Sequence, residues 1–118
     1  MTIVKHFNKF CGSKGEELAI KFLRKKKFKI LEQNYSNKIG EIDIIAEDKG
    51  VLVFVEVKAR ETLAFGRPAE AVDRRKQQKL RTTAQVYLMN KNKLECDRRF
   101  DVVEVLGEEI LNHIENAF

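Results

Sequence analysis

The chain has 118 residues, of which 43% are hydrophobic and 35% charged, and its formal net charge is +5. This length is typical of a single domain, expected here to span residues 1–118, that buries a core without disulfide staples. The two cysteines fit no metal-ligand or disulfide spacing, and no apolar run indicates a signal peptide or membrane span, so we expect a cytoplasmic protein without membrane contact.

The first predicted element is a helix. Residues 1–12 show no clear period and are expected to form a loose arm. Ser13 is a good N-cap, Glu16 three residues later completes a capping-box pattern, and apolar residues then recur at helical spacing. These features predict a helix over residues 14–26, and a weakly alternating strand follows over 28–33.

Two strands of a hairpin come next and carry the strongest patterns in the chain. Residues 41–47 and 51–58 are rich in β-branched side chains and alternate at period two. Asp48, Lys49 and Gly50 between them are typical turn residues. The two strands are therefore expected to pair antiparallel.

The remaining elements complete a mixed α/β pattern. A loop over 60–68 ends at Pro68, which suits the entry to a long helix expected over residues 69–90. Residues 99–106 predict another strand, and 110–114 predict a short last one. The expected architecture is one mixed sheet flanked by helices.

The hairpin also carries the residues that indicate chemistry. Side chains alternate faces along a strand, so Glu56 and Lys58 share one face at the end of an apolar strand. A two-residue turn at Lys49 and Gly50 sets Asp43 opposite Glu56, with Cβ atoms about 5 Å apart. Like charges at that separation destabilise a sheet, and a hard divalent cation such as Mg²⁺ or Mn²⁺ offsets the repulsion. A three-residue turn would instead set Asp43 opposite Val55.

Such a site suits phosphodiester hydrolysis. A metal held by Asp43 and Glu56 polarises a phosphate and lowers the pKa of a bound water. Lys58 then stabilises the developing charge or orients that water. A plain solvated surface pair is the alternative, because the spacing D-x12-E-x-K is loose and occurs by chance in many proteins.

Several further segments match the pattern of one family. They are GEELA at 15–19, GEIDII at 40–45, FVEVKAR at 54–60, FGRPAEAV at 65–72, RFDVV at 99–103 and HIENAF at 113–118. From Lys14 to Phe118 the chain resembles the YraN family, a largely uncharacterised bacterial family with a predicted restriction-endonuclease-like fold. That family is similar to archaeal Holliday-junction resolvases and to the wider PD-(D/E)xK nucleases. The resemblance implies that Asp43, Glu56 and Lys58 occupy active-site positions and that Glu16 has a role there.

Helix geometry leaves two interpretations of Glu16 open. At 100° per residue, Glu16 lies about 90° from the centre of the apolar stripe, on its border. It either leans toward the sheet and the metal or acts as a capping-box residue. Glu17 points nearly opposite the stripe and is expected in solvent.

Basic residues near this site are the expected nucleic-acid contacts, since a net positive charge favours polyanionic partners. Arg60 and Arg67 flank the loop beyond the E-x-K segment and are suited to hold a phosphate backbone. Lys76 and Lys79 belong to a cationic run on the second helix, which is either a phosphate-binding face or a solvated one. Asp101 and Glu104, on a later strand, are interpreted as structural or surface acids. His113 has no partner by sequence spacing and is interpreted as incidental.

Together these features predict a Mg²⁺- or Mn²⁺-dependent endonuclease-like protein that hydrolyses DNA, with branched or otherwise structured DNA as one expected substrate class. The alternative is a non-catalytic nucleic-acid-binding module that uses the same fold. Junction-cutting relatives act as dimers, so a homodimer is one further expectation.

Overall fold

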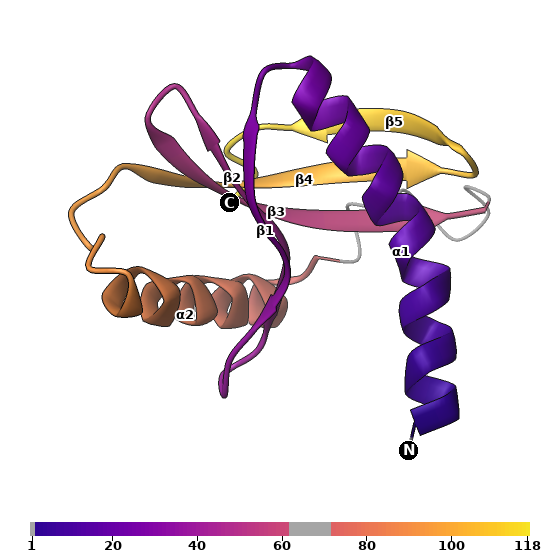
Figure 1. The fold of residues 1–118 in the computed structure, drawn as a ribbon, viewed down its shortest axis with the longest axis horizontal. Helices are drawn as coiled ribbons and strands as arrows, with labels where there is room; N and C mark the ends of the chain where they lie inside the picture. Colours follow the sequence, from indigo (N-terminus) through magenta and orange to yellow (C-terminus); the bar gives the residue numbers. More distant parts are fainter. Residues whose placement is uncertain (1, 62–71) are drawn as a thin grey trace.

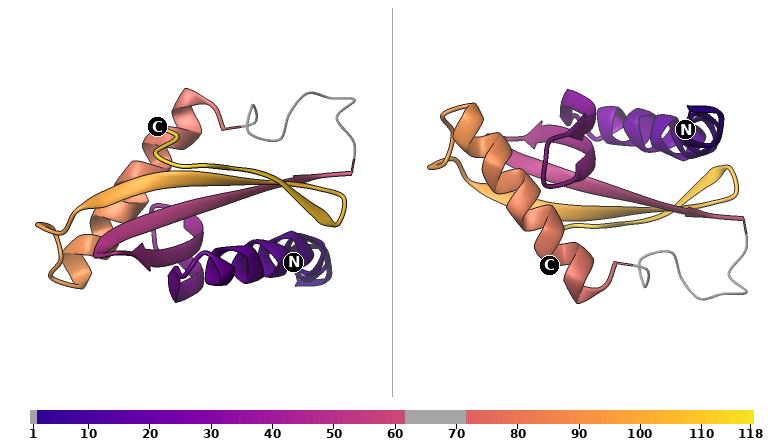
Figure 2. Two further views of the ribbon diagram at one scale, coloured as in Figure 1. Left: turned by 90° about the horizontal axis from the view of Figure 1, so that it is seen from above. Right: turned by 90° about the horizontal axis from the view of Figure 1, so that it is seen from below.

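The computed structural model describes residues 2–61 and 72–118, with the side chains of the first helix described from Lys14 onward. Five strands form a sheet with a helix on each face (Figures 1 and 2). In chain order the elements are α1 (Thr2–Lys25), β1 (Lys29–Ser36), β2 (Glu41–Asp48), β3 (Val51–Arg60), α2 (Arg74–Asn90), β4 (Arg98–Leu106) and β5 (Glu109–Ile114). Neither helix described in these two ranges is both long and apolar enough to cross a membrane.

The sheet is mixed and follows the strand order β1-β2-β3-β4-β5. β1, β2 and β3 form an antiparallel meander, β3 and β4 are parallel, and β4 and β5 pair antiparallel. A parallel pair needs a crossover connection, and α2 belongs to the segment that joins β3 to β4. The expected α/β class, a mixed sheet flanked by helices, is confirmed.

β3 lies in the middle of the sheet and is buried on both sides. Val53 and Val55 belong to the core under α1, whereas Leu52 and Phe54 belong to the core under α2. Burial on both faces explains why the strand is apolar almost throughout. Because side chains alternate along a strand, Glu56 falls on the α2 side of the sheet.

α1 begins earlier than the sequence pattern predicts. The helix runs from Thr2, so the loose arm expected over residues 1–12 is wrong for residues 2–12, and Ser13 lies inside the helix rather than at its cap. The N-terminal half of α1 extends past the strands in Figure 1, so no sheet surface imposes an apolar period on it. Gly15 marks the contact with the sheet, because a Cβ there would lie 3.2 Å from the Cβ of Ala59.

α2 begins later than the sequence pattern predicts. Asp73 is its N-cap, and the Asp73 carboxylate accepts a hydrogen bond of 2.9 Å from the backbone N–H of Lys76. Val72 and Asp73 lie before the helix, so the expected start at residue 69 is wrong. The reason is that a short polar cap satisfies the first free N–H groups and fixes the helix start locally. Pro68 lies outside the described residues.

Candidate functional site

The β2–β3 hairpin has the two-residue turn that the site hypothesis requires. Lys49 and Gly50 adopt φ values of 53° and 88°, a pattern typical of a tight hairpin turn. The pairs run from Asp48 with Val51 to Ile44 with Val55. The ladder ends at the pair of Ile44 with Val55, one residue short of Asp43 and Glu56, so it does not include the predicted pairing of these two acids.

At Asp43 the side chain, rather than the strand ladder, makes the contact with β3. The Asp43 Oδ2 atom accepts a hydrogen bond of 2.8 Å from the backbone N–H of Val57. On the other side of β2, β1 passes Asp43 at Asn34, between the pairs of Gln33 with Ile44 and Tyr35 with Ile42. Asn34 has a left-handed φ of 51°. Asn tolerates this conformation better than most residues. The hydrogen bond from Val57 holds the Asp43 carboxyl toward β3.

Two lysines converge on the carboxylate of Glu56, which is only 6% exposed. The Nζ atom of Lys58, from the same strand, lies 3.4 Å from Glu56 Oε2. The Nζ atom of Lys76, from the first turn of α2, lies 2.9 Å from the same oxygen. The Glu56 carboxylate is therefore held by one cation from its own strand and one from the helix above the sheet.

The proximity of these groups shifts their proton affinities. Burial and the charge of Glu56, with a smaller contribution from Glu16, raise the pKa of Asp43 to about 8, although the hydrogen bond from Val57 opposes the shift. Burial and the neighbouring Lys76 lower the pKa of Lys58. Burial lowers the pKa of Lys76, but its hydrogen bond and ion pair with Glu56 outweigh that effect and leave the pKa raised. With its pKa raised in this way, the Asp43 carboxyl group holds a proton near neutral pH.

Asp43, Glu56 and Lys76 line a pocket of about 280 Å³ between β2, β3 and α2. Its lining residues are Gly40, Glu41, Asp43, Glu56, Lys76, Lys79 and Leu80. Asp43 and Glu56 therefore line the same pocket, so the structure brings these two predicted site residues together. Lys76 and Lys79, predicted as nucleic-acid contacts, form part of the α2 wall of this pocket.

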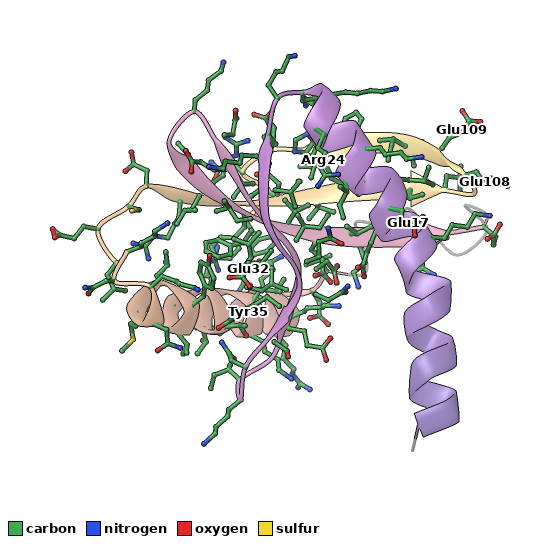
Figure 3. The ribbon with its side chains drawn as sticks, in the orientation of Figure 1. Glu17, Arg24, Glu32, Tyr35, Glu108 and Glu109 are labelled. Atoms are coloured by element: carbon green, nitrogen blue, oxygen red, sulfur yellow. The ribbon has the colours of Figure 1, made fainter. Side chains whose placement is uncertain are left out.

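Glu16 acts on this site from α1 through its charge. It lies within the helix, so the capping-box interpretation is wrong, and its carboxylate contributes to the raised pKa of Asp43. Within residues 2–61 and 72–118, no group of three His, Cys, Asp or Glu side chains is placed to hold a metal ion. Asp43 and Glu56 line the pocket together with a third acid, Glu41, which is exposed. Glu17 is exposed, as predicted (Figure 3).

Of the two arginines predicted to hold a phosphate backbone, Arg60 lies at the end of β3. Arg60 is partly exposed at that end, where its backbone carbonyl accepts a hydrogen bond of 2.8 Å from Gly107. Arg67 lies outside the described residues. Tyr35, which Figure 3 shows above α2, packs edge-on against Tyr87 with ring centroids 5.0 Å apart. Tyr35 is therefore a packing residue rather than a free stacking surface.

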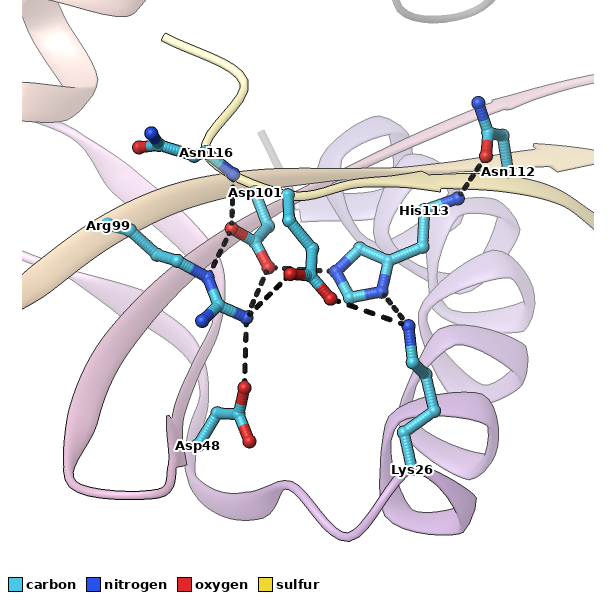
Figure 4. A network of polar contacts seen from close by, with 8 residues as sticks. Lys26, Asp48, Arg99, Asp101, Asn112, His113 and Asn116 are labelled. Carbon is cyan, nitrogen blue, oxygen red and sulfur yellow. Dashed lines mark hydrogen bonds and ion pairs between the residues drawn. The ribbon is translucent and has the colours of Figure 1, made fainter.

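A second polar cluster, on the α1 side of the sheet, was not predicted (Figure 4). Asp101 is fully buried and accepts hydrogen bonds from His113 Nε2 at 2.8 Å and Arg99 Nε at 3.0 Å. The other ring nitrogen of His113 lies 2.8 Å from Lys26 Nζ, so the interpretation of His113 as incidental is wrong. Asp101 and Glu104 are both fully buried, which excludes the surface interpretation of either.

Comparison with known proteins identifies the family. The model of a family described as "Uncharacterised protein family UPF0102" matches residues 15–105. The chain belongs to the UPF0102 family. This confirms the resemblance to the YraN family that the sequence motifs indicated. The UPF0102 match includes Glu16, the β2–β3 hairpin and α2, and therefore every described residue that lines the pocket.

Individual UPF0102 relatives match nearly the whole chain. A UPF0102 protein of Caldanaerobacter subterraneus subsp. tengcongensis is 51% identical over 116 residues, covering 93% of this chain and 95% of the relative. A UPF0102 protein of Clostridioides difficile is 47% identical over 112 residues, covering 94% and 98%. One of Persephonella marina is 41% identical over 107 residues, covering 91% of each chain.

Proposed function

We propose that this UPF0102 protein is a divalent-metal-dependent endonuclease that hydrolyses phosphodiester bonds in DNA, with Mg²⁺ or Mn²⁺ held by Asp43 and Glu56. One observation carries the proposal: Asp43, Glu56 and Lys76 line one pocket, and the ammonium groups of Lys58 and Lys76 lie 3.4 and 2.9 Å from Glu56 Oε2. An acid pair, one buried and one half-buried, with lysines beside it provides cation ligands and a means of stabilising a phosphate in the same place.

The pair of acids fits a hard divalent cation. Mg²⁺ takes oxygen ligands and is commonly bound by one or two carboxylates, with water and substrate phosphate completing its coordination. Burial and neighbouring negative charges raise the pKa of Asp43 to about 8. Because a proton is retained where two carboxylates repel each other, a doubly charged cation is the group that would allow both acids to ionise.

The surrounding side chains support the chemistry of hydrolysis. When bound, the cation polarises a phosphate and makes a water more acidic. Lys58, whose ammonium lies 3.4 Å from Glu56 Oε2, orients the attacking water or stabilises the charge that develops on the phosphate. Glu16 adds negative charge near Asp43, which strengthens the attraction for a cation.

Positive charge at the mouth of the pocket supports a nucleic-acid substrate. Lys79 lines the pocket, and Arg60 lies partly exposed at the end of β3; Arg67 is proposed as a further backbone contact from the sequence alone. Such cations bind phosphates without reading base sequence. Branched or otherwise structured DNA is one substrate class of the proposal, and a homodimer is its further part; both come from the resemblance of the sequence to Holliday-junction resolvases.

The mixed sheet supports a relationship with restriction-endonuclease-like nucleases. The acids lie on adjacent antiparallel strands, and the E-x-K segment forms the second of them. This is the arrangement implied by the resemblance of the sequence to PD-(D/E)xK nucleases. The fold by itself does not specify an activity, so the pocket residues carry the proposal.

The test is cleavage of nicked, flapped and four-way DNA with Mg²⁺, Mn²⁺ or EDTA. Wild type is expected to cut one of these substrates only with metal, and Asp43→Asn and Glu56→Gln are expected to lower the rate at least about 100-fold. Asp97→Asn is the matched control, because Asp97 is an exposed acid outside the pocket. Glu17→Gln is the corresponding control for Glu16→Gln.

Two results would overturn the proposal. Equal cleavage by wild type and Asp43→Asn would show that the activity does not arise in this pocket. Binding of DNA without cleavage, together with no change in thermal stability on addition of Mn²⁺, would instead favour the alternative of a non-catalytic nucleic-acid-binding module, since a metal that binds the native state must stabilise it.

A further inference from the structure

We infer that Lys76 is a resident cation of the metal pocket, which holds Glu56 in the absence of metal, competes with the divalent ion, and turns to a phosphate of the nucleic acid once the ion has displaced it. The inference rests on the proposed function and extends it. It assigns to the first turn of α2 a part in controlling how tightly the metal binds.

The contact between Lys76 and Glu56 is the shorter of the two ion pairs at this carboxylate. Lys76 Nζ lies 2.9 Å from Glu56 Oε2, against 3.4 Å for Lys58. The Glu56 side chain is 7% exposed, so little water reaches it. An ammonium group this close occupies one acceptor position of that oxygen and repels an arriving cation, so it competes with a metal for the carboxylate.

Lys76 is placed where it can move. Its side chain is 41% exposed, whereas that of Lys58 is 20% exposed. Lys76 lies on the wall of the pocket, and Lys79, about one turn later in α2, lies beside it on the same wall. The ammonium group of Lys76 can therefore leave Glu56 for a phosphate at the pocket mouth while the core under α2 keeps its packing.

The local electrostatics of α2 oppose a lysine at this position. Asp73 is the N-cap, so Arg74, Arg75 and Lys76 form the first turn, which contains no acidic residue. The N-terminus of a helix carries a positive partial charge and favours anions rather than cations. A cation at this end of the helix needs an anion opposite it, and for Lys76 that anion is Glu56.

Charge repulsion links metal binding to the departure of Lys76. Lys76 Nζ lies 2.9 Å from Glu56 Oε2, so a divalent ion bound at that carboxylate would lie close to the ammonium group and repel it. Lys76 is the lysine that moves, because its side chain is 41% exposed and that of Lys58 only 20%. The displaced ammonium group lies next to the ion, where a phosphate that bridges the two would be held by both charges.

The test compares the affinity for Mn²⁺ of wild type, Lys76→Met and Arg75→Met by isothermal titration calorimetry without DNA. Removing the competitor should tighten Mn²⁺ binding by about tenfold, the effect expected for one hydrogen bond to a charged group. Arg75→Met removes the same charge from the neighbouring, exposed position, and its affinity should stay within about twofold of wild type. Lys76→Arg keeps the charge and should restore the weaker, wild-type affinity.

A second measurement separates competition from a structural role. In cleavage assays Lys76→Met should reach half-maximal rate at a lower Mn²⁺ concentration than wild type and should show a higher KM for DNA. Thermal unfolding in EDTA checks that the variant folds. If Lys76→Met does not fold, Lys76→Gln tests the same point, since it removes the charge and keeps a hydrogen-bond donor for Glu56.

The outcomes distinguish this inference from the proposed function. If Mn²⁺ binds wild type and Asp43→Asn equally, the metal site itself is wrong. If Mn²⁺ binds through Asp43 and Glu56, but Lys76→Met binds it no more tightly than Arg75→Met does, the metal site stands and the role of Lys76 is wrong.

Discussion

In EDTA, the protein is expected to lose stability as the pH rises from 5 to 7, and Asp43→Asn is expected to remove that loss. Burial and the charge of Glu56 raise the pKa of Asp43 from 3.8 to about 8 in the folded protein. Between these two values the folded state holds a proton that the unfolded state has released. Stability therefore falls with rising pH, and the contribution is lost once the pH passes the folded pKa.

The magnitude follows from the proton count. One proton more in the folded than in the unfolded state changes the free energy of unfolding by about −1.4 kcal/mol per pH unit. Across pH 5 to 7, wild type should lose about 3 kcal/mol relative to Asp43→Asn. Asn resembles the protonated acid in shape and charge, so the variant should fold and should gain its largest advantage near pH 8.

The assay is urea denaturation of both proteins at pH 5, 6, 7 and 8 in EDTA. The difference between the two free energies cancels every group that titrates in both proteins. Asp97→Asn should follow wild type, because Asp97 is exposed and lies outside the pocket. Adding Mn²⁺ should flatten the difference in slope, since the cation replaces the proton.

Parallel curves for wild type and Asp43→Asn between pH 5 and 7 would refute this reasoning. They would mean that the pKa of Asp43 in the folded protein is near its ordinary value. Burial and the charge of Glu56 would then not act on its carboxyl group as described.

Four further outcomes are expected. Mn²⁺ at 100 times its Kd should raise the free energy of unfolding of wild type by about 2.7 kcal/mol and leave Asp43→Asn unchanged in urea titrations. Lys58→Met should lower kcat for DNA at least about 100-fold, while calorimetry shows the Kd for Mn²⁺ within about threefold of wild type. Burial raises the pKa of Asp101, but hydrogen bonds from His113 and Arg99 outweigh it and hold the pKa below 3.8. Asp101→Asn should therefore cost about 3 kcal/mol at pH 7, and denaturation titrations should show this gap shrinking as the pH falls below about 4. Gly15→Leu should cost about 1–3 kcal/mol in thermal denaturation, because a Cβ at Gly15 already lies 3.2 Å from Ala59 Cβ, whereas Leu at the exposed neighbour Lys14 should cost much less.

The hairpin and its acids could be predicted from the sequence because their geometry is local. The turn at Lys49 and Gly50 fixes the register of β2 against β3, and strand alternation then fixes which side chains share a face. Asp43 and Glu56 were assigned to one site by that argument alone. The five strands and the two helices were also predicted, because each carries its own periodicity.

The helix boundaries were less predictable, because local patterns compete at both helix starts. The capping-box pattern at Ser13 and Glu16 is a real local signal, yet α1 continues through it from Thr2. α2 begins instead at the local cap of Asp73, later than its apolar pattern predicted. Each helix thus carries two local patterns that place its start differently, and the sequence alone does not rank them.

The sequence by itself determined that β2 and β3 pair through a two-residue turn, and it singled out Asp43 and Glu56 as acids of one site. Only the tertiary structure brought Lys76 onto Glu56 and His113 onto Asp101. The physical reason is that strand pairing follows from a turn of two residues and a period of two, both visible in the chain. A contact between a helix and a sheet depends instead on where a long crossover returns and how the helix is rotated on the core, and no short stretch of sequence encodes either.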